Sequence, residues 1–280
     1  MRKRENAIAF CLAVLKYMFL VFIAVISLGP ILWAFTGSFK SYTEINSSAL
    51  SLPSSLRFKN YADAFKYAPI GRFFLNSITI TGLSIGLTLF CVCPCAYVVS
   101  RFKFKARSII ILFVSAALLL PAQALSQPLF TLLNALSIFD TKRGLILVYS
   151  AFGIPITFFI MASYYHTIPR EMEEAAYIDG AGFLRTFGTV VLPLAKPGIM
   201  TSAVLQFINT WNEFYFALIL TSGRTARTIP IALNYYLGTF ANNYSALFAA
   251  VIMTVLPTIV IFILAQEQVV ESLTAGAVKG

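Results

Sequence analysis

Long apolar runs separated by short charged loops dominate the chain. A helix needs roughly 20 apolar residues to cross a bilayer, and in lipid each span must satisfy its own backbone hydrogen bonds. We therefore predict an all-α membrane protein with six transmembrane helices, since the strand alternation of a membrane barrel is absent from the pattern. The six runs cover about 9–35, 73–99, 108–132, 144–165, 198–220 and 244–266.

Composition agrees with a membrane protein and gives an orientation. The chain is 59% hydrophobic and only 11% charged, whereas soluble domains carry about 25% charged residues. Basic residues favour the cytoplasmic side in short loops, and they occur at 2–4 and again at 101–107. Six spans then return the C-terminus to the side of the N-terminus, so we expect both termini to be cytoplasmic. The basic residues of the long outer loop 36–71 weigh little, because long loops follow this rule poorly.

Several classes of function are disfavoured by the residues present. The net charge of +10 is spread over the loops, and no basic run with interleaved aromatics indicates nucleic acid; contact with anionic lipid headgroups is the simpler interpretation. The four cysteines fall inside predicted spans, where they are expected to be apolar fillers and not metal ligands. We find no nucleophile–base pair, no paired catalytic carboxylates and no metal cluster, so the sequence does not predict an enzyme.

The inside segment 166–197 has a pattern of its own. Acidic residues near the start of a short helix interact favourably with its positive end, and three glutamates at 171, 173 and 174 follow Pro169. Glycines 180 and 182 can end that helix, and a second piece at about 183–192 places Phe183 and Phe187 on one face. We predict two short helices outside the membrane. An acidic helix suits a protein partner better than an anionic lipid surface, the alternative for an amphipathic loop.

A family resemblance rests on these residues and on others along the chain. The motif E174-A-A-x-x-x-G180 with V191-L192-P193 resembles the EAA loop of ABC-importer permeases. The tail LTAGAVKG at 273–280, the AYVVSRFKFKARS segment at 96–108 and WNEF at 211–214 are similar to the carbohydrate-importer branch, akin to the second permease subunit of the maltose importer.

The resemblance implies a function, partners and site residues. It implies a permease subunit in the bacterial cytoplasmic membrane that moves a sugar, with cytoplasmic ATPase subunits, a second homologous permease chain and an extracytoplasmic binding protein as partners. The loop at about 166–197 would carry a coupling helix between spans four and five, and the tail would lie near the ATPase interface. The implied coupling residues are Glu173, Glu174, Ala175, Ala176, Asp179 and Gly180, and those of the tail are Gly276 and Lys279.

No nucleotide site is expected in this chain. A P-loop requires G-x-x-x-x-G-K-[ST] between a strand and a helix, whereas the tail TAGAVKG has no Ser or Thr after its lysine and no preceding strand. No cofactor is therefore predicted here, and ATP would be bound by the partner subunit.

A polar stripe marks the fifth predicted span. Ser202, Gln206, Asn209 and Glu213 are spaced four, three and four residues apart, so they share one face of a helix, and Asn212 adjoins them. An acid inside a span is expected to face a cavity or a partner. The stripe predicts a translocation path or a permease–permease interface, while hydrogen bonding between helices accounts equally well for each residue alone. A weaker stripe comprises Gln123, Gln127 and Asn134, and Trp211 and Tyr215 are expected to be interface anchors.

Residues 1–71 are expected to form the first span and an outer loop, and residues 72–280 the permease core. The function predicted is that of a sugar-importer permease subunit. Three alternatives stay open at this stage: an importer of glycerol phosphate or another polar solute, an ion-coupled carrier acting alone, and a membrane scaffold without a substrate. The sequence names neither the sugar nor the partner chains.

Overall fold

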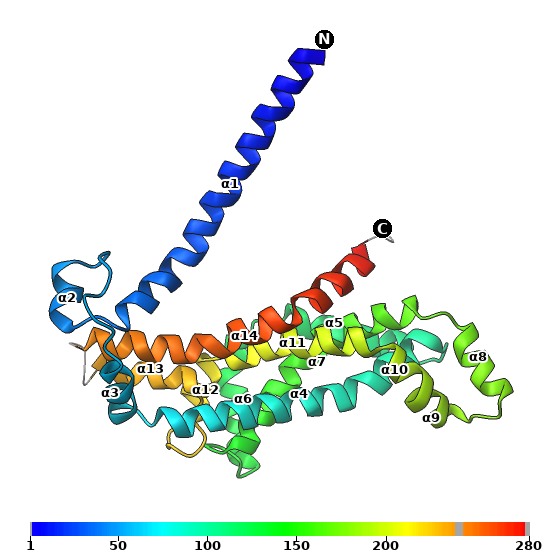
Figure 1. Ribbon diagram of the computed structural model, residues 1–280. Coiled ribbons are helices and arrows are strands. Elements are labelled where there is room, and N and C mark those ends of the chain that lie inside the picture. Colours follow the sequence, from blue (N-terminus) through cyan, green and yellow to red (C-terminus); the bar gives the residue numbers. More distant parts are fainter. Residues whose placement is uncertain (1, 239–242, 278–280) are drawn as a thin grey trace. The chain divides into compact units, whose positions relative to one another are not determined.

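The described part of the molecule is helical throughout. The computed structural model describes residues 2–238 and 243–277, with side chains described for 10–236 and 243–267; these residues contain no strand. Four helices are long and apolar enough to cross a membrane and match predicted spans one, two, four and six. They are α1 (Arg2–Gly37), α4 (Ile70–Arg101), α7 (Lys142–Thr167) and α14 (Tyr244–Ala277) (Figure 1).

The third predicted span is not one straight helix. Residues Arg107–Leu119 and Ala122–Ala135 are bent by 100° relative to each other; the helices here are α5 (Arg107–Leu119), the 3₁₀ turn η1 (Ala122–Leu125) and α6 (Ser126–Ala135). Proline supplies no N–H and disfavours the helical conformation of the residue before it. Leu120 and Pro121 are accordingly extended, and the chain changes direction there.

The fifth predicted span is also broken. Helix α11 (Lys196–Trp211) has only 16 residues, and α12 (Tyr215–Leu220) follows as a separate short helix. On its other side, α11 is bent by 70° relative to Phe183–Leu194. The prediction of one continuous helix over 198–220 was therefore wrong, because Glu213 lies outside α11 and accepts hydrogen bonds from the backbone of α12.

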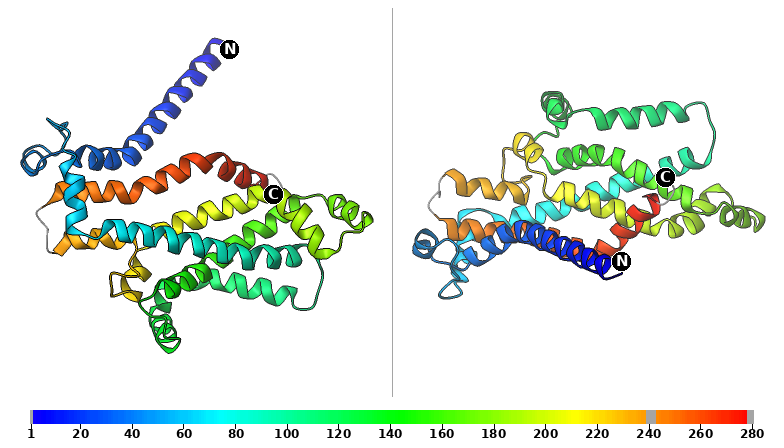
Figure 2. Two further views of the ribbon diagram at one scale, coloured as in Figure 1. Left: turned by 60° about the horizontal axis from the view of Figure 1, so that its bottom comes forward. Right: turned by 90° about the horizontal axis from the view of Figure 1, so that it is seen from above.

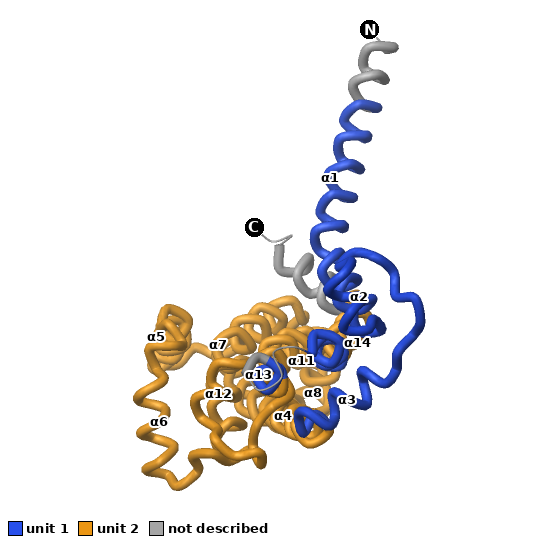
Figure 3. The backbone as a smooth tube through the Cα atoms, turned by 90° about the vertical axis from the view of Figure 1, so that its left-hand side faces the viewer, with its two compact units in different colours: residues 1–70, 233–255 blue, residues 71–232, 256–280 orange. Residues whose placement is uncertain are grey.

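The chain divides into two compact units, coloured separately in Figure 3. Unit 1 comprises residues 1–70 and 233–255 and contains α1, α2 (Tyr42–Ser47) and α3 (Lys59–Tyr67). The Phe248 ring packs against Trp33, with ring centroids 4.9 Å apart. The fully buried Lys40 donates hydrogen bonds to the backbone carbonyls of Ser48 and Ala49, both at 3.0 Å, and so folds the loop after α1 onto itself.

Unit 2 comprises residues 71–232 and 256–280. Helices α4 and α7 run side by side in the same direction, because Ser84 bonds to the Ile146 carbonyl and Thr88 to the Ser150 carbonyl. Small hydroxyl residues such as these let two helix backbones approach, and Tyr165 near the end of α7 also donates to the Cys93 carbonyl at 3.2 Å. Helices α5 and α11 both pack on α7 (Figure 2). Cys93 is buried within this core and Cys91 is exposed.

The predicted pair of short helices lies at the end of unit 2 where α4 and α7 finish (Figure 1). The first is α8 (Glu171–Ile178); the second consists of α9 (Phe183–Thr186), the π-helical segment η2 (Phe187–Val191) and α10 (Leu192–Leu194). Gly180 ends α8 at a φ of +79°, where a residue with a Cβ would be strained. The Ala181 N–H bonds to the Ala176 carbonyl and the Gly180 N–H to the Tyr177 carbonyl, which satisfies the last carbonyls of the helix.

Candidate functional site

Helix α8 presents two different faces. Glu173 and Ala176 are buried against the body of unit 2, whereas Glu174, Ala175 and Asp179 are exposed. Neighbouring residues on a helix point about 100° apart, so Glu173 and Glu174 diverge as their positions require. The residues implied by the EAA motif thus fall into an inward group and an outward group.

The inward acid is bound by the end of α4. The Glu173 Oε1 atom lies 2.7 Å from the Arg101 Nε atom, and both side chains are less than one tenth exposed. The Glu173 Oε2 atom accepts a hydrogen bond from the Tyr97 hydroxyl at 2.7 Å. Arg101 also donates to the Ile168 carbonyl at 2.7 Å, in the segment between α7 and α8. Burying a carboxylate requires such partners, because an unpaired charge is very costly away from water.

The outward face of α8 and α9 is apolar as well as acidic. Ile178 is 87% exposed and Leu184 is 79% exposed, and Met172 and Tyr177 are each more than 40% exposed. We did not single out these four residues from the sequence. The signal available in the sequence was the run of apolar residues within the predicted short helices, since a contiguous exposed apolar patch is typical of an interaction site.

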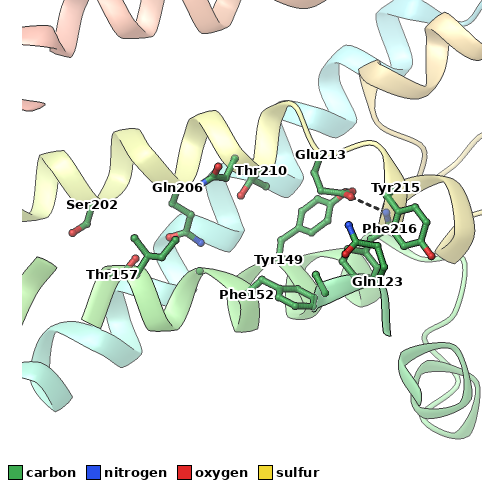
Figure 4. A pocket seen from close by; sticks show the side chains of 14 residues that line it. Gln123, Tyr149, Phe152, Thr157, Ser202, Gln206, Thr210, Glu213, Tyr215 and Phe216 are labelled. Carbon is green, nitrogen blue, oxygen red and sulfur yellow. Dashed lines mark hydrogen bonds between the residues drawn. The ribbon is translucent and has the colours of Figure 1, made fainter. Parts of the chain in front are cut away.

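A cavity of about 340 Å³ lies among α7, α11, α12 and the η1 turn (Figure 4). Four residues of the predicted stripe line it, namely Ser202, Gln206, Asn209 and Glu213. The fifth, Asn212, is exposed outside the lining and donates to the Ile208 carbonyl at 2.8 Å. Of the weaker stripe only Gln123 reaches the cavity. The opposing wall was not foreseen from the sequence: Tyr149, Phe152, Gly153, Ile156 and Thr157 of α7.

Gln206 is a buried polar residue of the lining. Its Nε2 atom donates to the Thr88 hydroxyl at 2.7 Å, while its buried Oε1 atom has no hydrogen-bond partner in the chain. The Ser202 hydroxyl is likewise buried without a partner. A Cβ added at Gly153 would lie 2.4 Å from the Gln206 Nε2 atom, so only glycine lets α7 approach this side chain.

Glu213 lines the cavity but also has a structural role. Its Oε1 atom accepts the Phe216 N–H at 2.7 Å, and its Oε2 atom accepts the Ala217 N–H at 3.0 Å and the Tyr149 hydroxyl at 2.6 Å. The carboxylate therefore caps the first turn of α12, whose N–H groups have no partner within the helix. The capping of α12 by Glu213 thus accounts both for the break after Trp211 and for an acid inside the predicted span.

The expectation that Trp211 is an interface anchor was wrong. Trp211 is only 2% exposed, and its ring packs against Phe207 at 5.4 Å and Phe74 at 5.5 Å between centroids. Trp211 therefore belongs to the packed interior of unit 2. Tyr215 is partly exposed, and its hydroxyl lies 2.8 Å from the Ser126 hydroxyl at the cavity.

A model of the family of binding-protein-dependent transport system inner membrane components matches residues 93–271. The chain belongs to this family. It is 36% identical over 269 residues to a diacetylchitobiose uptake system permease protein, NgcG, of Streptomyces coelicolor, covering 95% of this chain and 89% of that protein. It is 35% identical over 256 residues to a trehalose transport system permease protein, SugB, of Mycobacterium tuberculosis, covering 90% and 92%.

The fold is also shared with a solved structure. A bacterial ABC transporter involved in the import of the acidic polysaccharide alginate contains a chain that superposes with a TM-score of 0.82 at 22% identity, covering 91% of this chain and 95% of that chain. The family and the apolar helices together make this chain a multi-pass membrane protein, and its relatives are transport permeases.

The end of unit 2 opposite α8 is held together by a carboxylate. Asp140, between α6 and α7, accepts the N–H groups of Ser222 and Gly223 at 2.9 and 3.0 Å. Burial would raise the pKa of Asp140, but these hydrogen bonds together with Arg227 lower it below its ordinary value. Further along, Arg224 is exposed, and the Asn243 side chain accepts the Ala246 N–H.

The tail expected to lie near the ATPase interface is only partly described. In the tail, Gly276 belongs to the last turn of α14 and Lys279 lies outside the described residues. The expected division at residue 71 and the roles of these residues stay predictions.

Proposed function

We propose that this chain is a membrane-spanning subunit of an ATP-driven importer of sugars or oligosaccharides in the bacterial cytoplasmic membrane. The family and the saccharide names of the relatives support this function. The proposal includes separate cytoplasmic ATPase subunits, a second homologous permease and an extracytoplasmic binding protein. One crystal structure with the same fold is that of an alginate ABC transporter in complex with an alginate pentasaccharide-bound periplasmic protein.

The observation that carries the coupling part of the proposal is the two-sided character of α8. Its inner face is fixed to α4 by Glu173, and its outer face combines Glu174 and Asp179 with the exposed side chain of Ile178. Apolar anchors surrounded by charged groups are typical of protein interfaces. We assign the outer face to the ATPase subunit, with Ile178 and Leu184 as anchors in addition to the exposed motif residues Glu174, Ala175 and Asp179.

The basic residues support a cytoplasmic position for α8. Arg101, Lys103, Lys105 and Arg107 follow α4 at the same end of unit 2 as α8, and short basic loops favour the cytoplasm. If each bent helix pair counts as one span, the chain crosses the membrane six times. Both termini then lie on the side of α8.

The cavity is the proposed passage for the sugar in this subunit. Its unpartnered groups, Gln206 Oε1 and Ser202 Oγ, can accept hydrogen bonds, and Glu213 adds carboxylate oxygens. Sugar hydroxyls donate to such acceptors, whereas a phosphate group brought near the Glu213 carboxylate would meet a like charge. The cavity therefore favours a neutral saccharide over glycerol phosphate.

Reconstitution tests the proposal. The chain is placed in proteoliposomes with the second permease, the ATPase and the binding protein, and uptake of a radiolabelled disaccharide is measured with and without ATP. Uptake that depends on ATP and on the ATPase supports the function. Uptake at the same rate without the ATPase would favour an ion-coupled carrier instead.

Variants of the outer face test the docking assignment. Ile178→Asp, Glu174→Lys and Gly180→Trp are expected to lower co-purification of the ATPase. Leu56→Asp is the matched control, because Leu56 is also exposed but lies in the loop between α2 and α3. Undiminished assembly in all three variants would contradict the assignment.

A further inference from the structure

Glu173 does not lie where a residue that touches the ATPase would lie. Its side chain is 9% exposed and faces the end of α4, while its neighbour Glu174 faces outward. Both carboxylate oxygens are engaged within the chain, one 2.7 Å from the Arg101 Nε atom and the other bonded to the Tyr97 hydroxyl at 2.7 Å. Since α4 is a spanning helix, these contacts join α8 directly to the membrane part.

Arg101 connects a third element to the same point. Its Nη2 atom donates to the Ile168 carbonyl at 2.7 Å, and Ile168 is the first residue after α7. The ends of the two parallel helices of unit 2 and the start of α8 thus share one buried guanidinium. A guanidinium suits this position because it is planar, permanently charged and donates in fixed directions.

Aromatic packing stiffens the joint around Tyr97. The Tyr97 ring stacks on Phe187 with centroids 5.0 Å apart and lies 5.7 Å from Phe183 and 5.6 Å from Tyr165. It therefore contacts both the segment after α8 and the last turns of α7. A displacement of α8 cannot leave these rings unchanged, because packed interiors transmit strain.

The backbone segment that follows α8 is less suited to transmit a displacement of α8. The chain leaves α8 through Gly180, which has a positive φ, and Gly182 follows it. Glycines give the backbone freedom to bend. On this side of α8, the stiff connection to the spans is thus the buried cluster and not the backbone.

We propose that Glu173, Arg101 and Tyr97 form the joint through which movement of α8 becomes movement of α4, so that they are positioning residues for energy coupling and not contacts to the ATPase. The inference rests on the proposed function and deepens it. A buried ion pair is weak evidence for stability, since an apolar replacement is often as stable. We infer the role of this ion pair in coupling from the elements that it connects, and not from its contribution to stability.

The experiment uses the complete importer in proteoliposomes and measures disaccharide uptake and ATP hydrolysis in the same vesicles. Glu173→Gln removes the charge with little change of shape, and Arg101→Gln removes the other partner. Both variants are expected to assemble and hydrolyse ATP, while the ratio of sugar moved to ATP hydrolysed falls about fivefold or more, the lower end of ordinary coupling between sites. The double variant is expected to be no worse than the worse single variant.

Two further variants separate coupling from folding. Tyr165→Phe removes a buried hydroxyl from the same core without touching Glu173, so it is the control and is expected to leave the ratio unchanged. Tyr97→Phe keeps the ring packing and loses only the bond to Glu173; it serves if the charge variants fail to fold, and a smaller fall of the ratio is expected.

The outcomes separate the two proposals. An unchanged ratio in all assembled variants would overturn the joint, as would loss of ATPase assembly in Glu173→Gln with a normal ratio in the residual complexes. Absence of ATP-dependent uptake by the unaltered importer would instead overturn the proposed function.

Discussion

The contact between Gly153 and Gln206 permits a sharp prediction about the cavity wall. In Gly153→Ala the new Cβ would lie 2.4 Å from the Gln206 Nε2 atom and 2.7 Å from its Cδ atom. Contacts that short do not persist, so one partner has to move. Gln206 is only 4% exposed and is bonded to Thr88, and its free direction is the adjoining cavity.

The magnitude follows from two costs. Overpacking of a well-packed interior costs about 1–3 kcal/mol, and loss of the Gln206–Thr88 hydrogen bond adds about 1 kcal/mol. Thr88 itself stays paired, because its hydroxyl donates to the Ser150 carbonyl. Alanine gains about 1 kcal/mol over glycine in a helix interior, and Gln206 can move the end of its side chain into the cavity, so we expect Gly153→Ala to destabilise the chain by about 1–3 kcal/mol in total and to reduce uptake by pushing Gln206 into the passage.

A double-mutant cycle isolates the contact. Gln206→Ala removes the atoms that the new methyl group would meet, so Gly153→Ala with Gln206→Ala is expected to cost at least about 1 kcal/mol less than the sum of the single variants. Unfolding in detergent micelles titrated with dodecyl sulfate, followed by far-ultraviolet circular dichroism, measures each free energy. Gly86→Ala in α4 is the matched control, because a Cβ there meets nothing within 4 Å. Additive costs within about 0.5 kcal/mol would refute the reasoning.

Three further predictions concern acids that the fold holds in hydrogen bonds. Tyr149→Phe removes the 2.6 Å bond to Glu213 and is expected to cost about 1.5–3 kcal/mol in the same unfolding assay; a cost below 0.5 kcal/mol would mean that the bond contributes nothing. Because the pKa of Asp140 is lowered in the folded chain, its stabilisation is present above its unfolded pKa and is lost as the pH falls through the folded pKa. Asp140→Asn is therefore expected to lower the melting temperature at pH 7, and its melting temperature is expected to fall less on acidification than that of the unaltered chain. Equal falls of the melting temperature would argue against this role. Hydrogen bonds from Ser54 and Ser41 lower the pKa of Glu44 to about 2, so in the unaltered chain the loop 41–54 is expected to keep its hydrogen-exchange protection at pH 3. In Glu44→Gln the same loop is expected to lose that protection even at pH 7. Equal protection in both proteins would exclude this role.

Helix positions were predictable where one local signal decided them. Four spans followed from apolar length alone, and the short helix α8 followed from its acidic start and its glycine stop. The two broken spans were missed for different reasons. The bend at Pro121 was visible in the sequence as a proline inside an apolar run, but the end of α11 depends on Glu213 binding the backbone of α12.

The candidate site was predictable as a face and not as a set of contacts. Helical spacing placed Ser202, Gln206 and Glu213 together, and they do line one cavity. The opposite wall comes from α7, more than 40 residues earlier in the sequence, and a single helix pattern cannot identify it. Glu173 and Glu174 are adjacent and chemically identical, so only the packed structure distinguishes the inner one from the outer one.

The two buried or half-buried glutamates bear on how the transporter is energised. An ion-coupled carrier acting alone needs membrane-embedded groups that take up and release its ion. Glu213 is the one charged residue in the cavity lining, and its oxygens are occupied by two backbone N–H groups and the Tyr149 hydroxyl. If it exchanged its proton or bound an ion during each cycle, it would release the start of α12 each time. Glu173 in turn faces the end of α4 and not the cavity. Both acids hold helix ends in place and are poorly suited to take up and release an ion in each cycle, which agrees with the proposal that an ATPase subunit docks on the exposed face of α8.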